Sequence, residues 1–170
     1  MIPTLCTIST AGFLAHTRCL VQSFLEHHEQ GHAFVLLVDG RADAAGIADK
    51  RCTVVEARAL DLPAWRAYAF RWEARQLCQV LIPYFLEYLF ASANCDRLCY
   101  CHADTLVYSP LTELEQALDT ARIVLVPQLL APLPEDGFHP SEAEILAAGT
   151  YSEACIGLSG YDQLKEMLAW

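Results

Sequence analysis

The chain has 170 residues, of which 54% are hydrophobic and 19% charged, and its formal net charge is −10. This composition is too apolar for a disordered chain, and the length fits one domain over residues 1–170. The negative charge argues against a nucleic-acid-binding protein, because such affinity comes largely from lysine and arginine contacts with phosphates. No uncharged apolar run approaches the roughly 20 residues that cross a bilayer, so we expect no membrane span.

Strands and helices are expected to alternate along the chain. Short apolar runs bounded by turn residues mark strands, and apolar residues at helical spacing mark helices. We expect strands at 4–9, 33–39, 52–56, 97–101, 122–127 and 154–158. We expect helices at 13–28, 61–70, 73–91, 111–119 and 141–148 and from residue 161, with a proline-rich loop at 128–140. Pro83 should kink or split the 73–91 helix.

This alternation predicts an α/β fold with a doubly wound, largely parallel, Rossmann-like sheet. The turn after the first expected strand contains a single glycine, Gly12, and the chain has no Gly-x-x-x-x-Gly-Lys-Ser/Thr segment. A dinucleotide-binding Rossmann domain and a P-loop are therefore disfavoured. A bound phosphate would need another partner.

The chain contains eight cysteines and lacks the basic amino-terminal segment of a secretory signal, so we expect a cytoplasmic protein with reduced thiols. Four potential metal ligands lie close in sequence: Cys95, Cys99, Cys101 and His102. Side chains alternate along a strand, so Cys99 and Cys101 should face one way and His102 the other. Because no second cysteine pair has a zinc-finger spacing, we interpret these cysteines as structural thiols.

Two acidic residues are expected at one edge of the sheet. Asp39 ends the second apolar run, and Asp104 follows the buried strand 97–101. Open α/β sheets bind ligands at the carboxyl ends of their strands, where an Asp can hold a hard divalent cation and, through it, a diphosphate. An acid after the second strand often binds a ribose hydroxyl. Turn or cap roles for both residues remain open alternatives.

The order of these motifs resembles that of GT-A-type glycosyltransferases, which use nucleotide-diphospho-sugars. The resemblance covers nearly the whole chain and rests on six segments in one order: 6–9, 13–18, 34–39, 81–86, 100–111 and 149–157. It implies that Thr7, Ile8 and Asp39 lie around the nucleotide and that Asp104 is a metal ligand. The implied donor is a nucleotide-diphospho-sugar, and the acceptor is unknown.

Three positions depart from the family pattern. His102 stands where the Asp-x-Asp motif of the family has its first Asp, and an imidazole at a metal site favours Mn²⁺ over Mg²⁺. Ile82 replaces a usual Lys and removes a cation that could lie near the diphosphate. Ser152, Glu153 and an alanine replace Asn-x-Gly, so Ser152 and Glu153 would face the sugar, with Glu153 as a candidate substitute carboxylate.

The sequence ends at Trp170, before the region that usually completes the acceptor side, so we expect a domain incomplete at its carboxyl terminus. Uncovered apolar surface would favour self-association. We expect little transfer activity from this chain alone, because displacement needs donor and acceptor held together. The predicted function is metal-dependent binding of a nucleotide-diphospho-sugar for glycosyl transfer. Alternatives are a non-catalytic relative that binds a nucleotide or partner protein, and an unrelated doubly wound domain.

Overall fold

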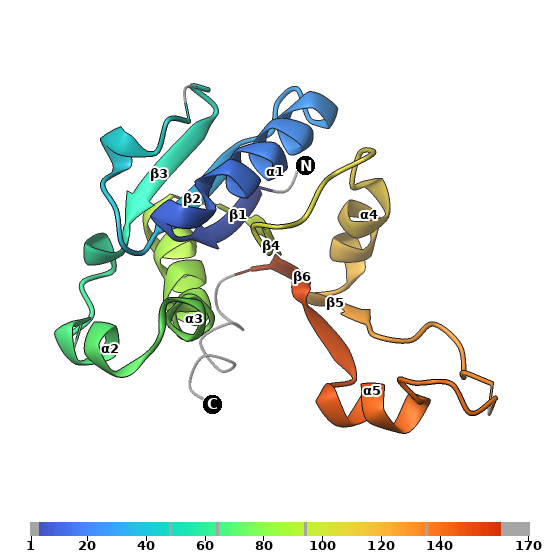
Figure 1. Ribbon diagram of the computed structural model, residues 1–170. Coiled ribbons are helices and arrows are strands. Elements are labelled where there is room, and N and C mark those ends of the chain that lie inside the picture. Colours follow the sequence, from blue (N-terminus) through green and yellow to red (C-terminus); the bar gives the residue numbers. More distant parts are fainter. Residues whose placement is uncertain (1–3, 48, 64, 94, 135, 161–170) are drawn as a thin grey trace.

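The computed structural model describes residues 4–47, 49–63, 65–93, 95–134 and 136–160. Strands in this part form one sheet in the order β3-β2-β1-β4-β6-β5 (Figure 1). The strands are β1 (Thr4–Ser9), β2 (Ala33–Leu37), β3 (Cys52–Glu56), β4 (Arg97–Cys101), β5 (Ile123–Pro127) and β6 (Tyr151–Ser159). The helices are α1 (Leu14–His27), α2 (Trp65–Arg71), α3 (Ala74–Ser92), α4 (Thr112–Thr120) and α5 (Glu142–Ala148), with 3-10 turns η1 (Ala11–Phe13), η2 (Ala42–Ala44) and η3 (Ala57–Leu60).

The sheet is largely parallel, as predicted. β1 pairs in parallel with β2 and β4, and β2 pairs in parallel with β3. β6 runs antiparallel to both β4 and β5. β6 begins at Tyr151 and ends at Ser159, so it is longer than the expected strand at 154–158. The helix expected from residue 161 lies outside the described residues.

Helices cover both faces of the sheet, which confirms the doubly wound α/β class. Phe24 of α1 and Leu5 of β1 belong to one buried cluster, and Phe85 of α3 and Cys6 of β1 belong to another. Leu5 and Cys6 are consecutive, so they point to opposite faces, as the pleat of a strand requires. The alternating burial of β1 therefore ties both layers of helices to one central strand.

Pro83 does not split α3, contrary to one of the two outcomes expected. The helix continues from Ala74 to Ser92 with Pro83 inside it. Proline cannot donate a backbone hydrogen bond, which costs the helix one bond of its ladder. Leu81, Phe85 and Leu89 are fully buried around this point. We infer that burial of these side chains against the sheet offsets the lost bond.

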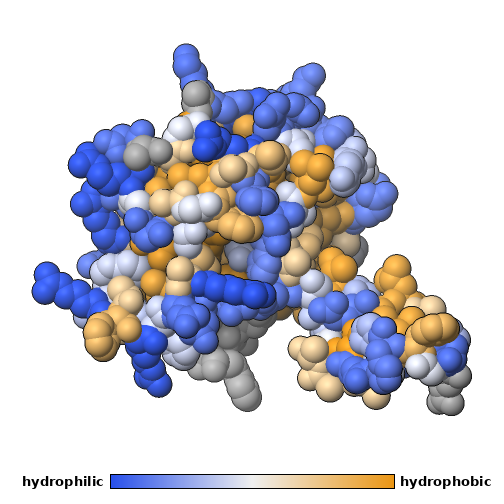
Figure 2. All heavy atoms as spheres, in the orientation of Figure 1, coloured by the Kyte–Doolittle hydropathy of each residue, from blue (hydrophilic) through white to orange (hydrophobic). Residues whose placement is uncertain are grey.

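The segment from β5 to β6 extends away from the rest of the sheet and carries α5 at its far end (Figure 1). Figure 2 shows polar and apolar atoms mixed over this extension, which includes the exposed apolar side chains of Val126, Leu130, Phe138, Leu146 and Tyr151. β5 is an edge strand, and an apolar edge favours pairing with another chain. Self-association stays a prediction. Among the described helices, none combines the length and apolar character needed to cross a membrane.

His28, which directly follows α1, is buried. It is 4% exposed, and its ring stacks on Phe24 with centroids 4.3 Å apart. The backbone N–H of Leu111 donates to Nε2 over 3.1 Å, so Nδ1 carries the proton and donates to the carbonyl of Phe24 over 2.9 Å. His28 therefore joins the end of α1 to the chain that enters α4.

Replacing His28 should destabilise the fold. The variant His28→Ala leaves the partly buried Leu111 N–H without its acceptor, and an unpaired buried group costs about 1–3 kcal/mol. Urea unfolding followed by circular dichroism should show this loss in the free energy of unfolding. The matched control is His27→Ala, because His27 is the exposed neighbour. Equal stabilities for the two variants would contradict this role for His28.

Candidate functional site

The strand order reverses between β1 and β4. From β1 the chain moves outward to β2 and β3, and it then returns to the other side of β1 as β4. α1, which follows β1, covers one face, whereas α3, which precedes β4, covers the other. In open α/β sheets, ligands bind outside the carboxyl ends of the strands at such a reversal.

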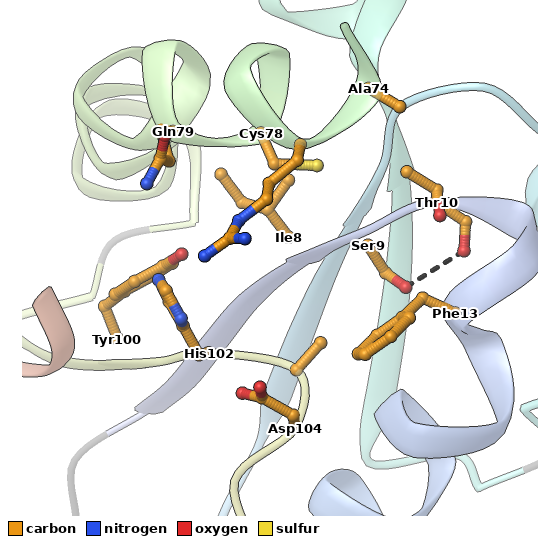
Figure 3. Close-up of a pocket in the computed structure, with 12 residues that line it drawn as sticks. Ile8, Ser9, Thr10, Phe13, Ala74, Cys78, Gln79, Tyr100, His102 and Asp104 are labelled. Carbon is orange, nitrogen blue, oxygen red and sulfur yellow. Dashed lines mark hydrogen bonds between the residues drawn. The ribbon is translucent and has the colours of Figure 1, made fainter.

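A pocket of about 490 Å³ lies at this point. Three parts of the chain form its wall: the end of β1 with η1, the first turns of α3, and the end of β4 with the turn after it (Figure 3). The lining residues are Ile8, Ser9, Thr10, Phe13, Ala74, Arg75, Cys78, Gln79, Tyr100, His102, Ala103 and Asp104. The predicted site residues Ile8, His102 and Asp104 are thus brought together.

His102 extends from the end of β4 into the pocket. Its backbone N–H donates to the carbonyl of Ala154 on β6 over 2.9 Å, which fixes the main chain. Its Nε2 lies 3.9 Å from Oε1 of Glu153, and the same oxygen accepts a 2.6 Å hydrogen bond from Gln79 of α3. Glu153 therefore stands beside the pocket, in contact with two of its lining residues, although its side chain is half exposed.

Tyr100 forms part of the pocket floor and contacts His102 edge to face, with ring centroids 5.9 Å apart. Burial, reinforced by the neighbouring Cys6, Cys78 and Glu153, raises the pKa of the Tyr100 hydroxyl. A raised pKa keeps the phenol protonated throughout the physiological range. Tyr100 is therefore a neutral hydroxyl that can donate a hydrogen bond to a ligand.

Asp104 is exposed and lines the pocket from the turn after β4. The turn closes through a 3.0 Å hydrogen bond from the Thr105 N–H to the carbonyl of His102. Among the described residues, none donates a hydrogen bond to the Asp104 carboxylate or forms an ion pair with it. A side-chain cap role for Asp104 is therefore not seen, and its oxygens are available to a ligand.

Asp39 lies at the same edge of the sheet as Asp104, as predicted. Its Oδ1 accepts a 2.6 Å hydrogen bond from the N–H of Ala11, directly after β1. Asp39 is not a lining residue of the pocket, whereas Cys78 is. The negative charge of Asp39 nevertheless helps raise the pKa of Cys78, so the two side chains lie near each other. Asp39 thus borders the pocket, with one carboxylate oxygen occupied by the turn that begins η1.

Besides Asp39 and Glu153, which stand beside the pocket, two further predicted site residues do not line it. Thr7 is fully buried in β1, and its Oγ1 has no hydrogen-bond partner in the described structure. Ser152 accepts a 3.2 Å hydrogen bond from the N–H of Ala154, which keeps its hydroxyl within its own strand. Strand alternation explains both placements, because Thr7 points away from Ile8, and Ser152 from Glu153.

Arg75 is the charged lining residue that sequence reasoning missed. It lies in the first turn of α3, beside Cys78 and Gln79 on the pocket wall. The start of this helix is marked by a 3.3 Å hydrogen bond from the backbone N–H of Glu73 to the side chain of Gln76. Ile82, expected to mark a lost cation, packs against the core instead and lies outside the lining. Arg75 supplies positive charge there.

The fold has counterparts among solved structures. Galactosyltransferase LgtC in complex with donor and acceptor sugar analogs aligns with a TM-score of 0.61 and 14% identity, over 95% of this chain and 59% of that one. The apo form of mouse xyloside xylosyltransferase 1 aligns with a TM-score of 0.54 and 13% identity, over 99% and 72%. The apo form of the glycosyltransferase GlyE of Streptococcus pneumoniae TIGR4 aligns with a TM-score of 0.57 and 11% identity, over 99% of this chain and 36% of that one. No protein-family model and no curated protein sequence matches the chain.

These alignments define the class of fold. The chain has the fold of GT-A-type glycosyltransferases, as the order of sequence motifs predicted. It spans about three fifths of the length of LgtC. At 11–14% identity the similarity concerns the fold, and the roles of individual residues have to be argued from the pocket itself.

The reactivity of Cys78 should report on the pocket wall. Burial, followed by the nearby charge of Asp39, raises the pKa of this thiol to about 11. Only the thiolate reacts with iodoacetamide, so the rate should rise about tenfold per pH unit from 7.5 to 9.5 without a plateau. Free cysteine, with a pKa of about 8.5, levels off over this range. Mass spectrometry of the Cys78 peptide measures the rate, and a plateau below pH 9 would contradict the assignment.

Proposed function

We propose that the pocket binds a nucleotide-diphospho-sugar through a divalent metal ion, and that the chain provides the donor side of a glycosyl-transfer reaction. The observation that carries this proposal is the meeting of three groups at one edge of the sheet. Asp104 and His102 reach the pocket from β4, and Arg75 reaches it from α3. The cationic side chain suits the negatively charged diphosphate, and the carboxylate and imidazole suit the positively charged metal ion bound to it.

The donor set fits a metal that is shared with a ligand. Asp104 offers a carboxylate and His102 an imidazole, and both line the same cavity. Within the described part of the chain, these two and Glu153 do not gather as closely as a preformed three-ligand site does. Divalent cations at phosphate sites usually take one or two protein ligands and complete their shell with phosphate oxygens and water. The imidazole favours Mn²⁺ among the candidates.

Arg75 and the beginning of α3 suit the diphosphate. A guanidinium can donate two parallel hydrogen bonds to phosphate oxygens. The first turn of a helix adds unpaired N–H groups and a partial positive charge, and α3 begins at the pocket. These groups would allow a chain with a net charge of −10 to hold a doubly charged anion.

The nucleoside would lie toward β1. Phe13 is 37% exposed on the wall, so its ring offers a face for a base. Ile8 would give an apolar floor, and the second oxygen of Asp39, which the Ala11 N–H leaves unoccupied, would accept from a ribose hydroxyl. Thr7 would take part only indirectly, by supporting strand β1 from the core. This arrangement keeps the predicted residues at the nucleotide while giving each a different part in its binding.

The sugar would lie toward β6. Glu153 is held by Gln79 beside His102, which leaves its other oxygen for a sugar hydroxyl. Ser152 would contribute only if its local hydrogen bond opened. When bound, the metal supplies positive charge that stabilises the departing diphosphate. Arg75 orients the phosphates and donates to them, and Tyr100 offers a neutral hydroxyl, so these residues bind and position without forming a covalent intermediate.

Removing the Asp104 carboxylate should abolish the metal-dependent part of nucleotide binding. We expect Asp104→Asn to weaken binding of uridine or guanosine diphosphate in Mn²⁺ at least about tenfold, which corresponds to 1.4 kcal/mol. Binding without Mn²⁺ should change little. Calorimetry with each nucleotide, with and without Mn²⁺, makes the comparison. The control is Asp119→Asn, because Asp119 pairs with Arg97 at the opposite edge of the sheet. An equal loss in both variants, or none in either, would argue against a metal site at Asp104.

Removing the Arg75 charge should weaken nucleotide diphosphate binding whether or not metal is present. Hydrogen bonds to charged groups contribute about 1.5–3 kcal/mol, so Arg75→Gln should cost roughly ten- to hundredfold in affinity. Binding of the nucleoside without phosphates should be unaffected. Arg66→Gln on α2 is the matched control, because Arg66 is exposed and lies outside the pocket lining. Unchanged diphosphate affinity in Arg75→Gln would place the phosphates elsewhere.

A further inference from the structure

Three cysteines meet on the face of the sheet opposite to the pocket. The sulfur atoms of Cys99, Cys101 and Cys155 all lie within 4.8 Å of one another, and the Cys99 and Cys101 sulfurs are 3.7 Å apart. All eight cysteines of the chain are free thiols. The alternation of β4 confirms that Cys99 and Cys101 point away from His102. The third member was not foreseen, because Cys155 comes from β6.

The pairing of β4 with β6 brings the third thiol into place. Cys101 stands opposite Cys155, and Cys99 stands opposite Gly157. The bond from the His102 N–H to the carbonyl of Ala154 makes that neighbouring pair the hydrogen-bonded one. Cys101 and Cys155 therefore form a pair of the non-hydrogen-bonded type, in which side chains approach more closely. The close approach follows from strand register and does not depend on flexible side chains.

The space around the thiols is apolar and closed on one side. Val107 belongs to the same buried cluster as Cys99 and Cys101, and the partly buried Leu114 of α4 packs against that cluster. A methyl group on Gly157 would lie 2.5 Å from Cδ1 of Leu114, so the glycine allows α4 to pack over the thiols. Cys155 is only partly buried, which leaves one side of the cluster open to an incoming ion.

The 3.7 Å separation of the Cys99 and Cys101 sulfurs is close to that of two sulfurs bound to one metal ion. Metal–sulfur bonds of about 2.3 Å separate the sulfurs of one site by roughly 3.8–4.0 Å. Structural zinc almost always has four ligands. In the described part of the chain, no His, Cys, Asp or Glu joins the three thiols as a fourth. Thiolates select soft ions such as Cu(I), and an ion with three ligands fits the cluster as it stands.

We propose that Cys99, Cys101 and Cys155 bind one Cu(I) ion through three sulfur atoms. The ion would join β4 to β6 close to His102 and Glu153 along the chain, but on the opposite face of the sheet. This site is separate from the nucleotide pocket, and neither depends on the other for its ligands.

The test uses the reduced, metal-free chain, titrated anaerobically with Cu(I) against a chromophoric Cu(I) chelator. The expected result is one Cu(I) held per chain, with three sulfur neighbours in the X-ray absorption spectrum. Cys155→Ser should weaken this binding at least a hundredfold, and Cys99→Ala should do the same. Cys155 is partly exposed, so its variant tests the site even if Cys99→Ala fails to fold.

The matched controls are Cys19→Ser and Cys52→Ser, which remove thiols outside the cluster. Both should bind Cu(I) as the parent chain does, and circular dichroism should show that each variant is folded. Retention of tight binding by Cys155→Ser would overturn the proposal. Loss of tight Cu(I) binding in Cys19→Ser would also overturn it, because the ion would then be bound by scattered thiols.

Discussion

The parallel pairing of β1 with β4 is the constraint on which the candidate site depends. It aligns Thr4 with Leu98 and Cys6 with Tyr100, so the two strands end side by side. The chain leaves β1 into η1 and α1, and it leaves β4 through the turn that holds Asp104. A reversal of strand order opens the edge of the sheet between them. The pocket is therefore a consequence of topology, and its chemistry is set by the few side chains at that edge.

The chemistry of the pocket combines charges of both signs within a negatively charged protein. Asp104, Asp39 and Glu153 place carboxylates at or beside the cavity, whereas Arg75 brings positive charge to the wall formed by α3. Carboxylates repel a diphosphate unless a cation lies between them. The proposed metal-dependent mode of binding rests on that balance, and His102 in place of a carboxylate lowers the negative charge the ion would meet.

Sequence patterns predicted the fold well because a strand or helix that is buried in the core needs apolar residues at a characteristic spacing. The apolar run before Asp39 and the run before His102 were predicted to be buried strands, and both strands end at the edge of the sheet that carries the candidate site. Side chains set by long-range packing were harder to foresee. His28 is buried because Leu111, 83 positions away, donates to it, and Arg75 reaches the pocket only because α3 begins at that edge. Cys155 joined Cys101 through the β4–β6 register, which no local pattern reveals.

The most direct measurement is to locate a bound paramagnetic ion. Substoichiometric Mn²⁺ is added to the ¹⁵N-labelled chain in the presence of a nucleoside diphosphate, and the loss of amide signals is mapped by NMR. The account predicts that the signals of Thr10, Ala103 and Asp104 broaden first, and that Asp104→Asn prevents this. Broadening that begins at the exposed acids of α5, Glu142 and Glu144, or that is indifferent to the nucleotide, would contradict it.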